Sequence, residues 1–242
     1  MDQYLKNKVV LVTGGSRGIG NAIAVKAAQA GANVAICARG RESLDKAVTQ
    51  LQQISPDILG IQTDVSQSKD VTACIKQIND AWGAVDILIN NAGIYRYAGI
   101  LENSTEDWDA QFAVNLKGPF LMTHAVVPGM KAQKSGTIIF ISSMVAVMSI
   151  PQHSCYSATK WGLDGFAGSI GQELCEYGIK VHTLRPGMTD TSIFDEIGKP
   201  DMDIDWIEPE EIADAVEFLL RLPKHAQVPE LNYTSTAHRK EY

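Results

Sequence analysis

A tyrosine and a lysine four residues apart are the side chains in this sequence best suited to chemistry. Tyr156 and Lys160 lie in a segment of helical pattern, so we expect both side chains on one face of a helix. An ammonium group near a phenol favours the phenolate and lowers the phenol pKa. Lowering that pKa by about 3 units requires roughly 4 kcal/mol of differential stabilisation. A tyrosine of this kind exchanges a proton with a substrate oxygen at neutral pH.

The polar residues that precede the Tyr-x-x-x-Lys pair strengthen the prediction that it is catalytic. Ser142 and Ser143 follow an apolar run, and a serine hydroxyl there can hold the same substrate oxygen by a hydrogen bond. Asn115 lies further upstream in another helical segment. We expect His153 to line a pocket or the surface rather than to act as a base. It is the combination of these residues that indicates proton transfer, because an isolated Tyr–Lys pair is common on solvent-exposed helices.

A glycine-rich turn occupies residues Thr13–Gly20, between the first apolar run and the first helical pattern. We expect Gly14 to permit a tight turn, Gly18 to let the backbone approach a pyrophosphate, and Gly20 to bring the helix close to the sheet. The helix that follows offers unpaired N–H groups and a partial positive charge to a phosphate. The turn therefore predicts dinucleotide binding, although its spacing differs from the common G-x-G-x-x-G.

The residues after the second apolar run predict which dinucleotide is bound. NAD-binding folds carry an Asp or Glu at this place to hold the ribose 2′-hydroxyl. This sequence has Cys37-Ala38-Arg39-Gly40-Arg41 there, without a carboxylate. The planar guanidinium of Arg39 suits a 2′-phosphate, and Arg17 can reach the same group. We therefore predict NADP (NADPH) in preference to NAD; the alternative is that both arginines are simply solvated.

Seven short apolar runs alternate with longer segments of helical period. Within each run the apolar residues follow one another instead of alternating with polar residues. This pattern is typical of strands covered on both faces in a parallel sheet. We predict a single α/β domain over residues 1–242, a Rossmann fold with a doubly wound parallel sheet of about seven strands. The expected strands are Lys8–Thr13, Asn33–Ala38, Ile58–Thr63, Val85–Asn90, Thr137–Ser142, Ile179–Leu184 and Glu230–Thr236.

Three further segments have recognisable roles. Ser104 is expected to cap a helix that begins before Trp108, and Pro209 to begin another. Residues 188–208 have little periodicity and are expected to form a mobile substrate loop, because loops of that length in compact domains are usually functional. Residues 237–242 form a polar tail.

Composition narrows the possible partners. The 242 residues include 21 Lys and Arg against 28 Asp and Glu, which leaves a net charge of −7 and argues against nucleic-acid binding. No apolar run approaches the roughly 20 residues of a membrane-spanning helix, so we expect no membrane partner. No Cys-x-x-Cys pair or other metal motif is present. Reduced thiols in a cytoplasmic protein are the expected state of the cysteines, which are Cys37, Cys74, Cys155 and Cys175.

Taken in order, these motifs resemble the short-chain dehydrogenase/reductase family over about Lys8–Arg221. The family serine lies thirteen residues before the tyrosine, which selects Ser143 over Ser142. The remaining matches are the glycine turn, Asp64 with Val65, Asn90-Asn91-Ala92-Gly93, Asn115, Tyr156, Lys160, Pro186-Gly187, Thr189 and Thr191.

The resemblance implies a role for each catalytic residue. Tyr156 would be the general acid/base, and Lys160 would lower its pKa and bind the nicotinamide ribose. Ser143 would orient the substrate carbonyl, and Asn115 would anchor a water in a proton relay; alternatively, Asn115 satisfies helix backbone at a kink. Asp64 would contact the adenine. The implied cofactor-binding residues are Gly14, Ser16, Arg17, Gly18, Ile19, Gly20, Arg39, Asp64, Val65, Asn91, Ala92, Gly93, Tyr156, Lys160, Pro186, Gly187, Thr189 and Thr191.

The predicted function is an NADP-dependent oxidoreductase that transfers hydride between nicotinamide and a carbonyl or secondary alcohol. Three alternatives remain: a 3-oxoacyl-thioester (acyl carrier protein) reductase, a non-catalytic NADP-sensing regulator and a sugar-nucleotide epimerase. The first is disfavoured because residues 228–236 are not glycine-rich, the second because Tyr156 and Lys160 are both present. The third would be expected to have a longer C-terminal domain.

The predicted substrate pocket is largely aromatic or Met, which favours a medium-sized apolar small molecule. Arg96 is a candidate carboxylate clamp if it faces inward. The resemblance also implies a homodimer or homotetramer joined through helices at about 105–132 and 155–177. The residues expected to face the substrate are Tyr95, Tyr97, Met144, Met148, His153, Met188, Phe194 and Trp206.

Overall fold

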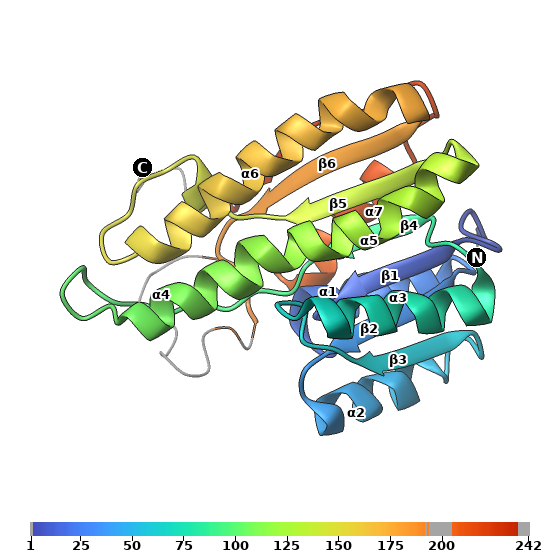
Figure 1. Ribbon diagram of the computed structural model, residues 1–242, viewed down its shortest axis with the longest axis horizontal. Helices are drawn as coiled ribbons and strands as arrows, with labels where there is room; N and C mark the ends of the chain where they lie inside the picture. The colour runs from blue at the N-terminus through green and yellow to red at the C-terminus, as the bar shows by residue number, and fades with distance from the viewer. Residues whose placement is uncertain (1, 192, 194–204, 237–242) are drawn as a thin grey trace.

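One parallel sheet of seven strands forms the centre of the computed structural model, which describes residues 2–191, 193 and 205–236 (Figure 1). The strands lie in the order β3-β2-β1-β4-β5-β6-β7, and each pairs in parallel with its neighbours. Their bounds are β1 Val9–Thr13, β2 Asn33–Ala38, β3 Ile58–Gln62, β4 Ile87–Asn90, β5 Gly136–Ile141, β6 Ile179–Pro186 and β7 Glu230–Tyr233. The predicted doubly wound Rossmann sheet is confirmed.

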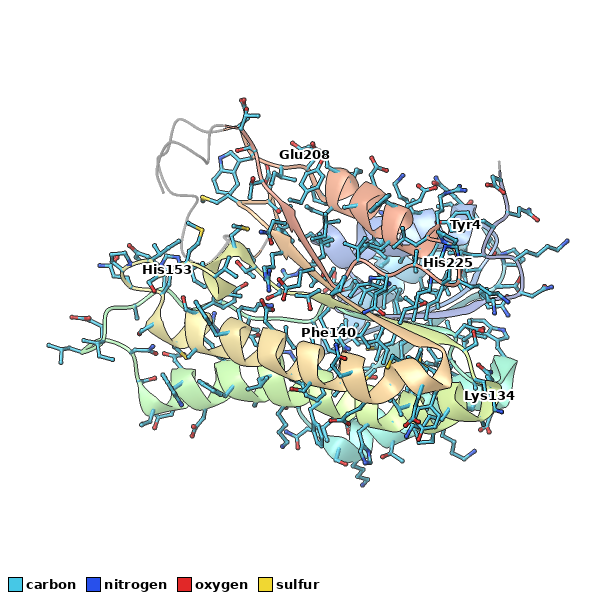
Figure 2. The ribbon with its side chains drawn as sticks, turned by 90° about the horizontal axis from the view of Figure 1, so that it is seen from above. Tyr4, Lys134, Phe140, His153, Glu208 and His225 are labelled. Carbon is cyan, nitrogen blue, oxygen red and sulfur yellow. The ribbon has the colours of Figure 1, made fainter. Side chains whose placement is uncertain are left out.

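Helices cover both faces of the sheet. One buried cluster joins the sheet to α1, α2 and α7, and a second joins it to α3, α5 and α6. Figure 2 shows Phe140 inside the second layer, between the sheet and its helices. The helices are α1 Gly18–Gln29, α2 Arg41–Leu51, α3 Ser68–Trp82, α4 Thr105–Phe112, α5 Gly118–Gln133, α6 Ser154–Leu174 and α7 Pro209–Leu220.

The continuous apolar runs of the sequence form strands that are buried on both faces. All five residues of β1 are buried, and so are all four of β4. Such strands suit the centre of a sheet sandwiched between helices. Two predicted strands are shorter than expected by more than one residue: β4 begins at Ile87 rather than Val85, and β7 ends at Tyr233 rather than Thr236.

Two predicted helix starts are confirmed by their caps. The Ser104 hydroxyl accepts a hydrogen bond from the Asp107 amide at 3.0 Å and begins α4. Pro209 occupies the first turn of α7, where Glu208 and Glu211 form a reciprocal capping box. The helix expected over about 105–132 is interrupted, because a π-helical turn at Ala113–Lys117 separates α4 from α5.

The order of the strands predicts where on the sheet a ligand binds. Strands β1 and β4 are neighbours in space, although two βα units separate them in sequence, so this is where the winding of the sheet reverses. Ligands of open α/β sheets bind at the carboxyl ends of the strands at such a point. His153 lies at that end of the molecule and Lys134 at the opposite end (Figure 2). Among the described residues, no helix is both long and apolar enough to cross a membrane.

Candidate active site

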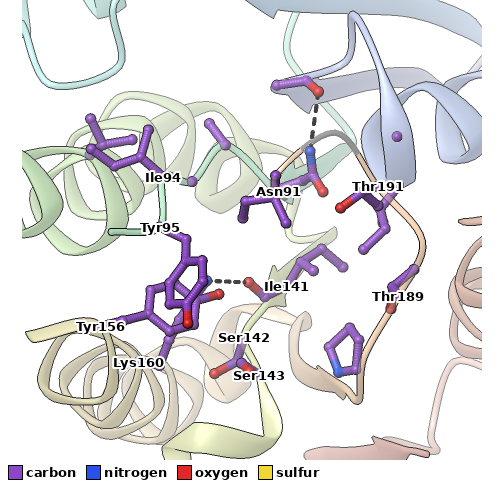
Figure 3. A pocket seen from close by; sticks show the side chains of 18 of the residues that line it. Asn91, Ile94, Tyr95, Ile141, Ser142, Ser143, Tyr156, Lys160, Thr189 and Thr191 are labelled. Atoms are coloured by element: carbon purple, nitrogen blue, oxygen red, sulfur yellow. Dashed lines mark hydrogen bonds between the residues drawn. The ribbon is translucent and has the colours of Figure 1, made fainter. Parts of the chain in front are cut away.

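A cavity of about 1070 Å³ lies at the carboxyl ends of the central strands. It runs from the glycine turn after β1 to the first turns of α6 (Figure 3). Most of the predicted site residues line it, although the sequence separates them by up to 177 positions. They are Gly14, Ser16, Arg17, Gly18, Ile19, Arg39, Val65, Asn91, Ala92, Gly93, Ser143, Tyr156, Lys160, Pro186, Gly187, Thr189 and Thr191.

Three predicted site residues do not line this cavity. Asn115 and Gly20 are buried behind its wall. Asp64 lines a smaller neighbouring pocket, where its carboxylate accepts hydrogen bonds from the Ser66 amide at 2.9 Å and the Ser66 hydroxyl at 2.7 Å. The adenine contact expected of Asp64 therefore stays a prediction.

The glycine turn has the backbone that its sequence predicts. Gly14 and Gly18 have φ angles of +66° and +54°, which disfavour residues with a Cβ. The Gly14 amide donates to the Cys37 carbonyl at 2.8 Å and fixes the turn against β2. Helix α1 then begins at Gly18, with its N-terminus at the cavity. This arrangement presents backbone N–H groups to an anion.

The role expected of Gly20 needs correction. A Cβ there would lie 2.4 Å from both the Asn91 amide nitrogen and the Gly14 carbonyl oxygen. The missing side chain thus makes room for the contact between the glycine turn and the end of β4, rather than for close packing of α1 on the sheet.

Thr13 is a structural residue that the sequence reasoning missed. Its hydroxyl accepts hydrogen bonds from the amides of Asn91 at 3.0 Å and Ala92 at 2.9 Å. In return, the Asn91 side chain donates to the Thr13 carbonyl at 2.9 Å. These bonds join the glycine turn to the segment after β4, so the Asn91 side chain builds the wall of the cavity.

The two arginines expected to select the cofactor are exposed and line the cavity. Within the described part of the chain, neither Arg17 nor Arg39 has a carboxylate within ion-pair distance. Arg41, two residues later, is instead paired with Asp45 at 2.8 Å on α2. The guanidinium groups of Arg17 and Arg39 are therefore available to an anion at this end of the cavity.

Helix α6 brings Tyr156 and Lys160 to the cavity on one face, as their spacing predicts. The Lys160 side chain is buried, and its ammonium nitrogen donates to the Ile141 carbonyl oxygen at 2.9 Å (Figure 3). Burial lowers the pKa of Lys160 to about 8, and the negative charge of Asp164, one turn further along α6, opposes that shift. The ammonium nitrogen lies 5.6 Å from the centre of the Tyr156 ring.

The pKa of Tyr156 differs from the sequence expectation. Burial raises it to about 12, and a hydrogen bond with Ser143 opposes the rise. In the chain by itself the phenol is thus protonated at neutral pH. Lys160 is not among the groups that shift this pKa in the chain by itself, and its ammonium donates to the Ile141 carbonyl. The lowering expected of Lys160 in the cofactor-bound protein stays a prediction.

Asn115 lies in the π-helical turn and is completely buried. Its side-chain oxygen accepts from the Ile94 amide at 2.8 Å, and its nitrogen donates to the Ile94 carbonyl at 2.8 Å and to the Thr159 hydroxyl at 3.2 Å. Asn115 therefore satisfies the backbone of a segment that lines the cavity, and it ties that segment to α6 beside Lys160. The alternative, in which Asn115 satisfies helix backbone at a kink, does not describe these contacts, because Ile94 lies outside any helix.

Both serines after β5 line the cavity, but they differ in their contacts. The Ser143 hydroxyl accepts from the Val145 amide at 3.3 Å and bonds with Tyr156. The Ser142 hydroxyl is buried without a hydrogen-bond partner among the described residues. Ser143 is therefore the serine placed beside the tyrosine.

Aromatic side chains surround the tyrosine end of the cavity. Of the residues expected to face the substrate, Tyr95, Tyr97, Met144, His153 and Met188 line it, and Met148 and Trp206 do not. Phe194 and most of the 188–208 segment lie outside the described residues, as does the 237–242 tail. At the described ends of that segment, Thr189 and Ile207 form an isolated β-bridge. The Arg96 guanidinium lies 3.5 Å from Asp107 and does not line the cavity, so it is not the expected carboxylate clamp.

Comparison with known proteins agrees with this arrangement. The model of the short chain dehydrogenase family matches residues 8–201. An uncharacterized oxidoreductase of Staphylococcus aureus (strain USA300) is 35% identical over 227 residues, which cover 94% of this chain and 96% of that protein. A 3-oxoacyl-[acyl-carrier-protein] reductase of Synechocystis sp. (strain PCC 6803) is 35% identical and covers 93% of each chain.

Two solved structures of similar fold contain nicotinamide cofactors. An alcohol dehydrogenase from the archaeon Thermococcus sibiricus, complexed with 5-hydroxy-NADP, is 32% identical with a TM-score of 0.89 over 97% of this chain and 99% of that one. The closed form of serine dehydrogenase with NADP+ is 28% identical with a TM-score of 0.86 over 93% of this chain and 94% of that one.

Proposed function

Because the chain belongs to the short-chain dehydrogenase/reductase family and is an NAD(P)-dependent oxidoreductase, we propose that it uses NADPH to reduce the carbonyl group of a small ketone or aldehyde. In the reverse direction it oxidises the corresponding alcohol with NADP+. The observation that carries this proposal is that one cavity holds both the anion-binding glycine turn and the Ser143, Tyr156 and Lys160 side chains.

The residues that would hold the cofactor fit its chemistry. The N–H groups at the start of α1 suit the pyrophosphate, and the exposed guanidinium groups of Arg17 and Arg39 suit a 2′-phosphate. The absence of a carboxylate after β2 supports NADP over NAD. In this proposal Asp64 and Val65 hold the adenine, and the nicotinamide end is held by Asn91–Gly93, Tyr156, Lys160, Pro186, Gly187, Thr189 and Thr191.

Bound NADPH would supply the hydride that reaches the carbonyl carbon. Tyr156, protonated at neutral pH, donates its proton to the carbonyl oxygen while Ser143 hydrogen-bonds the same oxygen. The positive charge of Lys160 stabilises the phenolate that remains. Solvent then returns the proton to Tyr156. Asn115 would support this return by fixing the backbone of Ile94 and by donating to the Thr159 hydroxyl, next to Lys160.

A second candidate is a 3-oxoacyl-thioester reductase, which the Synechocystis relative favours. The C-terminal sequence opposes it, because Glu230–Tyr233 and the residues after it are not glycine-rich. The likeness to the alcohol dehydrogenase and the serine dehydrogenase supports a small alcohol or carbonyl compound instead.

Assembly and compartment are part of the same proposal. The side chains of Phe120 on α5 and Trp161 on α6 are 47% and 53% exposed, which supports a homodimer or homotetramer joined through these helices. All four cysteines are free thiols, as expected of a protein in the reducing cytoplasm.

The test is an NADPH-oxidation assay against ketones, aldehydes, β-keto thioesters and 3-oxo acids, with NADH in parallel. We expect steady consumption with at least one small ketone or aldehyde and faster turnover with NADPH than with NADH. Turnover confined to β-keto thioesters would identify the second candidate. The absence of turnover with every carbonyl compound would contradict both.

A further inference from the structure

A hydrogen-bonded pair outside the Tyr156–Lys160 machinery lies at the substrate end of the cavity. The Tyr95 hydroxyl oxygen is 2.8 Å from the Nε2 atom of His153, and both residues line the cavity. The two come from separate segments, after β4 and just before α6, and Tyr95 as a whole is only 8% exposed. His153 is partly buried, and a polar pair that includes a buried hydroxyl constrains what can bind beside it.

The hydrogen bonds of His153 fix the direction of this contact. Its Nδ1 atom lies 2.7 Å from the main-chain oxygen of Pro151, and a carbonyl oxygen can only accept. When the imidazole carries one proton, that proton is therefore on Nδ1, and Nε2 is the acceptor. The Tyr95 hydroxyl must donate to Nε2, so its proton is committed to His153. Toward the cavity, the Tyr95 oxygen can act only as an acceptor.

This acceptor lies next to the reacting groups. The rings of Tyr95 and Tyr156 meet edge to face with their centres 5.0 Å apart (Figure 3). Tyr97 packs edge-on against His153 with ring centres 5.5 Å apart and lies 6.4 Å from the Tyr95 ring, so the three rings form one cluster. A substrate whose carbonyl oxygen contacts Tyr156 thus places its neighbouring carbons beside Tyr95.

Among the residues that the structure describes, this wall carries no arginine that could pair with an acidic substrate. Arg96 is not among the residues that line the cavity, and its guanidinium lies 3.5 Å from Asp107. The arginines among the described lining residues, Arg17 and Arg39, belong to the glycine turn and the end of β2, away from Tyr156. A carboxylate beside Tyr95 would meet an oxygen lone pair, with no arginine among the described lining residues near it, whereas a hydroxyl would donate to that oxygen.

We propose that Tyr95 and His153 select a neutral hydroxy ketone, in which a hydroxyl one or two carbons from the carbonyl donates a hydrogen bond to the Tyr95 oxygen. In the reverse direction the substrate is the corresponding diol. His153 is a positioning residue, because it acts by holding the Tyr95 proton away from the cavity. This inference rests on the proposed carbonyl reductase activity and names the substrate class of that site.

Two ketones of equal size test it directly. Hydroxyacetone and butanone differ by one hydroxyl in place of a methyl group, and the ratio of their kcat/KM values at saturating NADPH isolates that hydroxyl. We expect the wild-type ratio to favour hydroxyacetone by about tenfold, the value of one good hydrogen bond. Tyr95→Phe should bring the ratio close to one. Tyr177→Phe, the same change at a ring that packs on Lys131 on α5, should leave the ratio as in the wild type.

A second variant and a further substrate distinguish failure of this inference from failure of the proposed function. His153→Leu frees the Tyr95 proton, so the ratio should fall there too, which keeps the test open if Tyr95→Phe does not fold. Pyruvate, with a carboxylate at the same place, should be reduced more slowly than hydroxyacetone. A wild-type ratio near one, or a ratio unchanged in Tyr95→Phe, overturns this inference while turnover of both ketones upholds the proposed function. Failure of every carbonyl compound overturns both.

Discussion

Lys160 and Ile141 join helix α6 to strand β5 at the floor of the cavity. The Lys160 ammonium donates to the Ile141 carbonyl oxygen at 2.9 Å, and the lysine is only 4% exposed. A buried ammonium group is unfavourable for folding, because the interior solvates it less well than water does. The protein thus holds a positive charge beside Tyr156 at the expense of stability.

The stability cost of Lys160 should depend on pH. Its pKa is about 8 in the folded protein and 10.5 in the unfolded chain, so between these values the unfolded state binds more protons and stability rises with pH. Relative to Lys160→Met, the wild type should gain about 3 kcal/mol from pH 8 to pH 10.5 and nothing below pH 8. Urea unfolding of both proteins across pH 7–11 measures this gain. A constant difference between them would show that the lysine is not buried in its charged form.

Charge reversal at Arg39 should change the cofactor. In Arg39→Asp a carboxylate repels the 2′-phosphate of NADPH and can accept from the 2′-hydroxyl of NADH, so the ratio of kcat/KM values should shift toward NADH by at least about tenfold. Arg41→Asp is the matched control, because Arg41 pairs with Asp45 and does not line the cavity. The prediction is wrong if the wild type prefers NAD over NADP, or if Arg39→Asp leaves cofactor selectivity unchanged.

Gly20 is predicted to tolerate no side chain. The Cβ of Gly20→Ala would lie 2.4 Å from the Asn91 side chain and the Gly14 carbonyl, so the glycine turn must shift. We expect a lower melting temperature and at least about a tenfold loss of NADPH affinity, measured by fluorescence titration. Gly165→Ala on α6 meets no atom within 4 Å and should instead stabilise the protein by roughly 0.5–1 kcal/mol. Equal effects of the two changes would contradict the assigned contact.

Asn115→Leu should reveal how much of the asparagine's contribution is structural. Leucine has a similar shape but leaves the Ile94 amide and carbonyl without their partners. Two partly buried backbone groups left without partners predict a loss of about 2 kcal/mol in the free energy of unfolding. Chemical denaturation gives that value directly. A loss below about 1 kcal/mol would mean that Ile94 finds other partners and that these bonds matter little for folding.

The fold was predictable because residues close together in the sequence mark its strands and helix starts. Solid apolar runs such as Val9–Thr13 mark buried parallel strands, and Ser104 and Pro209 mark helix starts. The site residues in the glycine turn and on α6 were predictable for the same reason, since spacing alone places Tyr156 and Lys160 on one face.

Contacts between distant segments were not predictable. The Thr13–Asn91 bonds join residues 78 positions apart, and the Tyr95–His153 bond joins residues 58 positions apart. The direction of the Tyr156 pKa shift depends on burial, which spacing does not reveal. The π-helical turn at Ala113–Lys117 was missed because its residues continue an ordinary helical pattern.

The central claim is that the Tyr156 hydroxyl moves a proton in the same cavity that binds NADPH, and Tyr156→Phe tests it most directly. The variant keeps the ring and removes only the hydroxyl. Single-turnover reduction of an accepted ketone should slow by at least about a thousandfold, while NADPH affinity measured by fluorescence titration should change less than about threefold. Near-normal turnover in Tyr156→Phe would contradict the account.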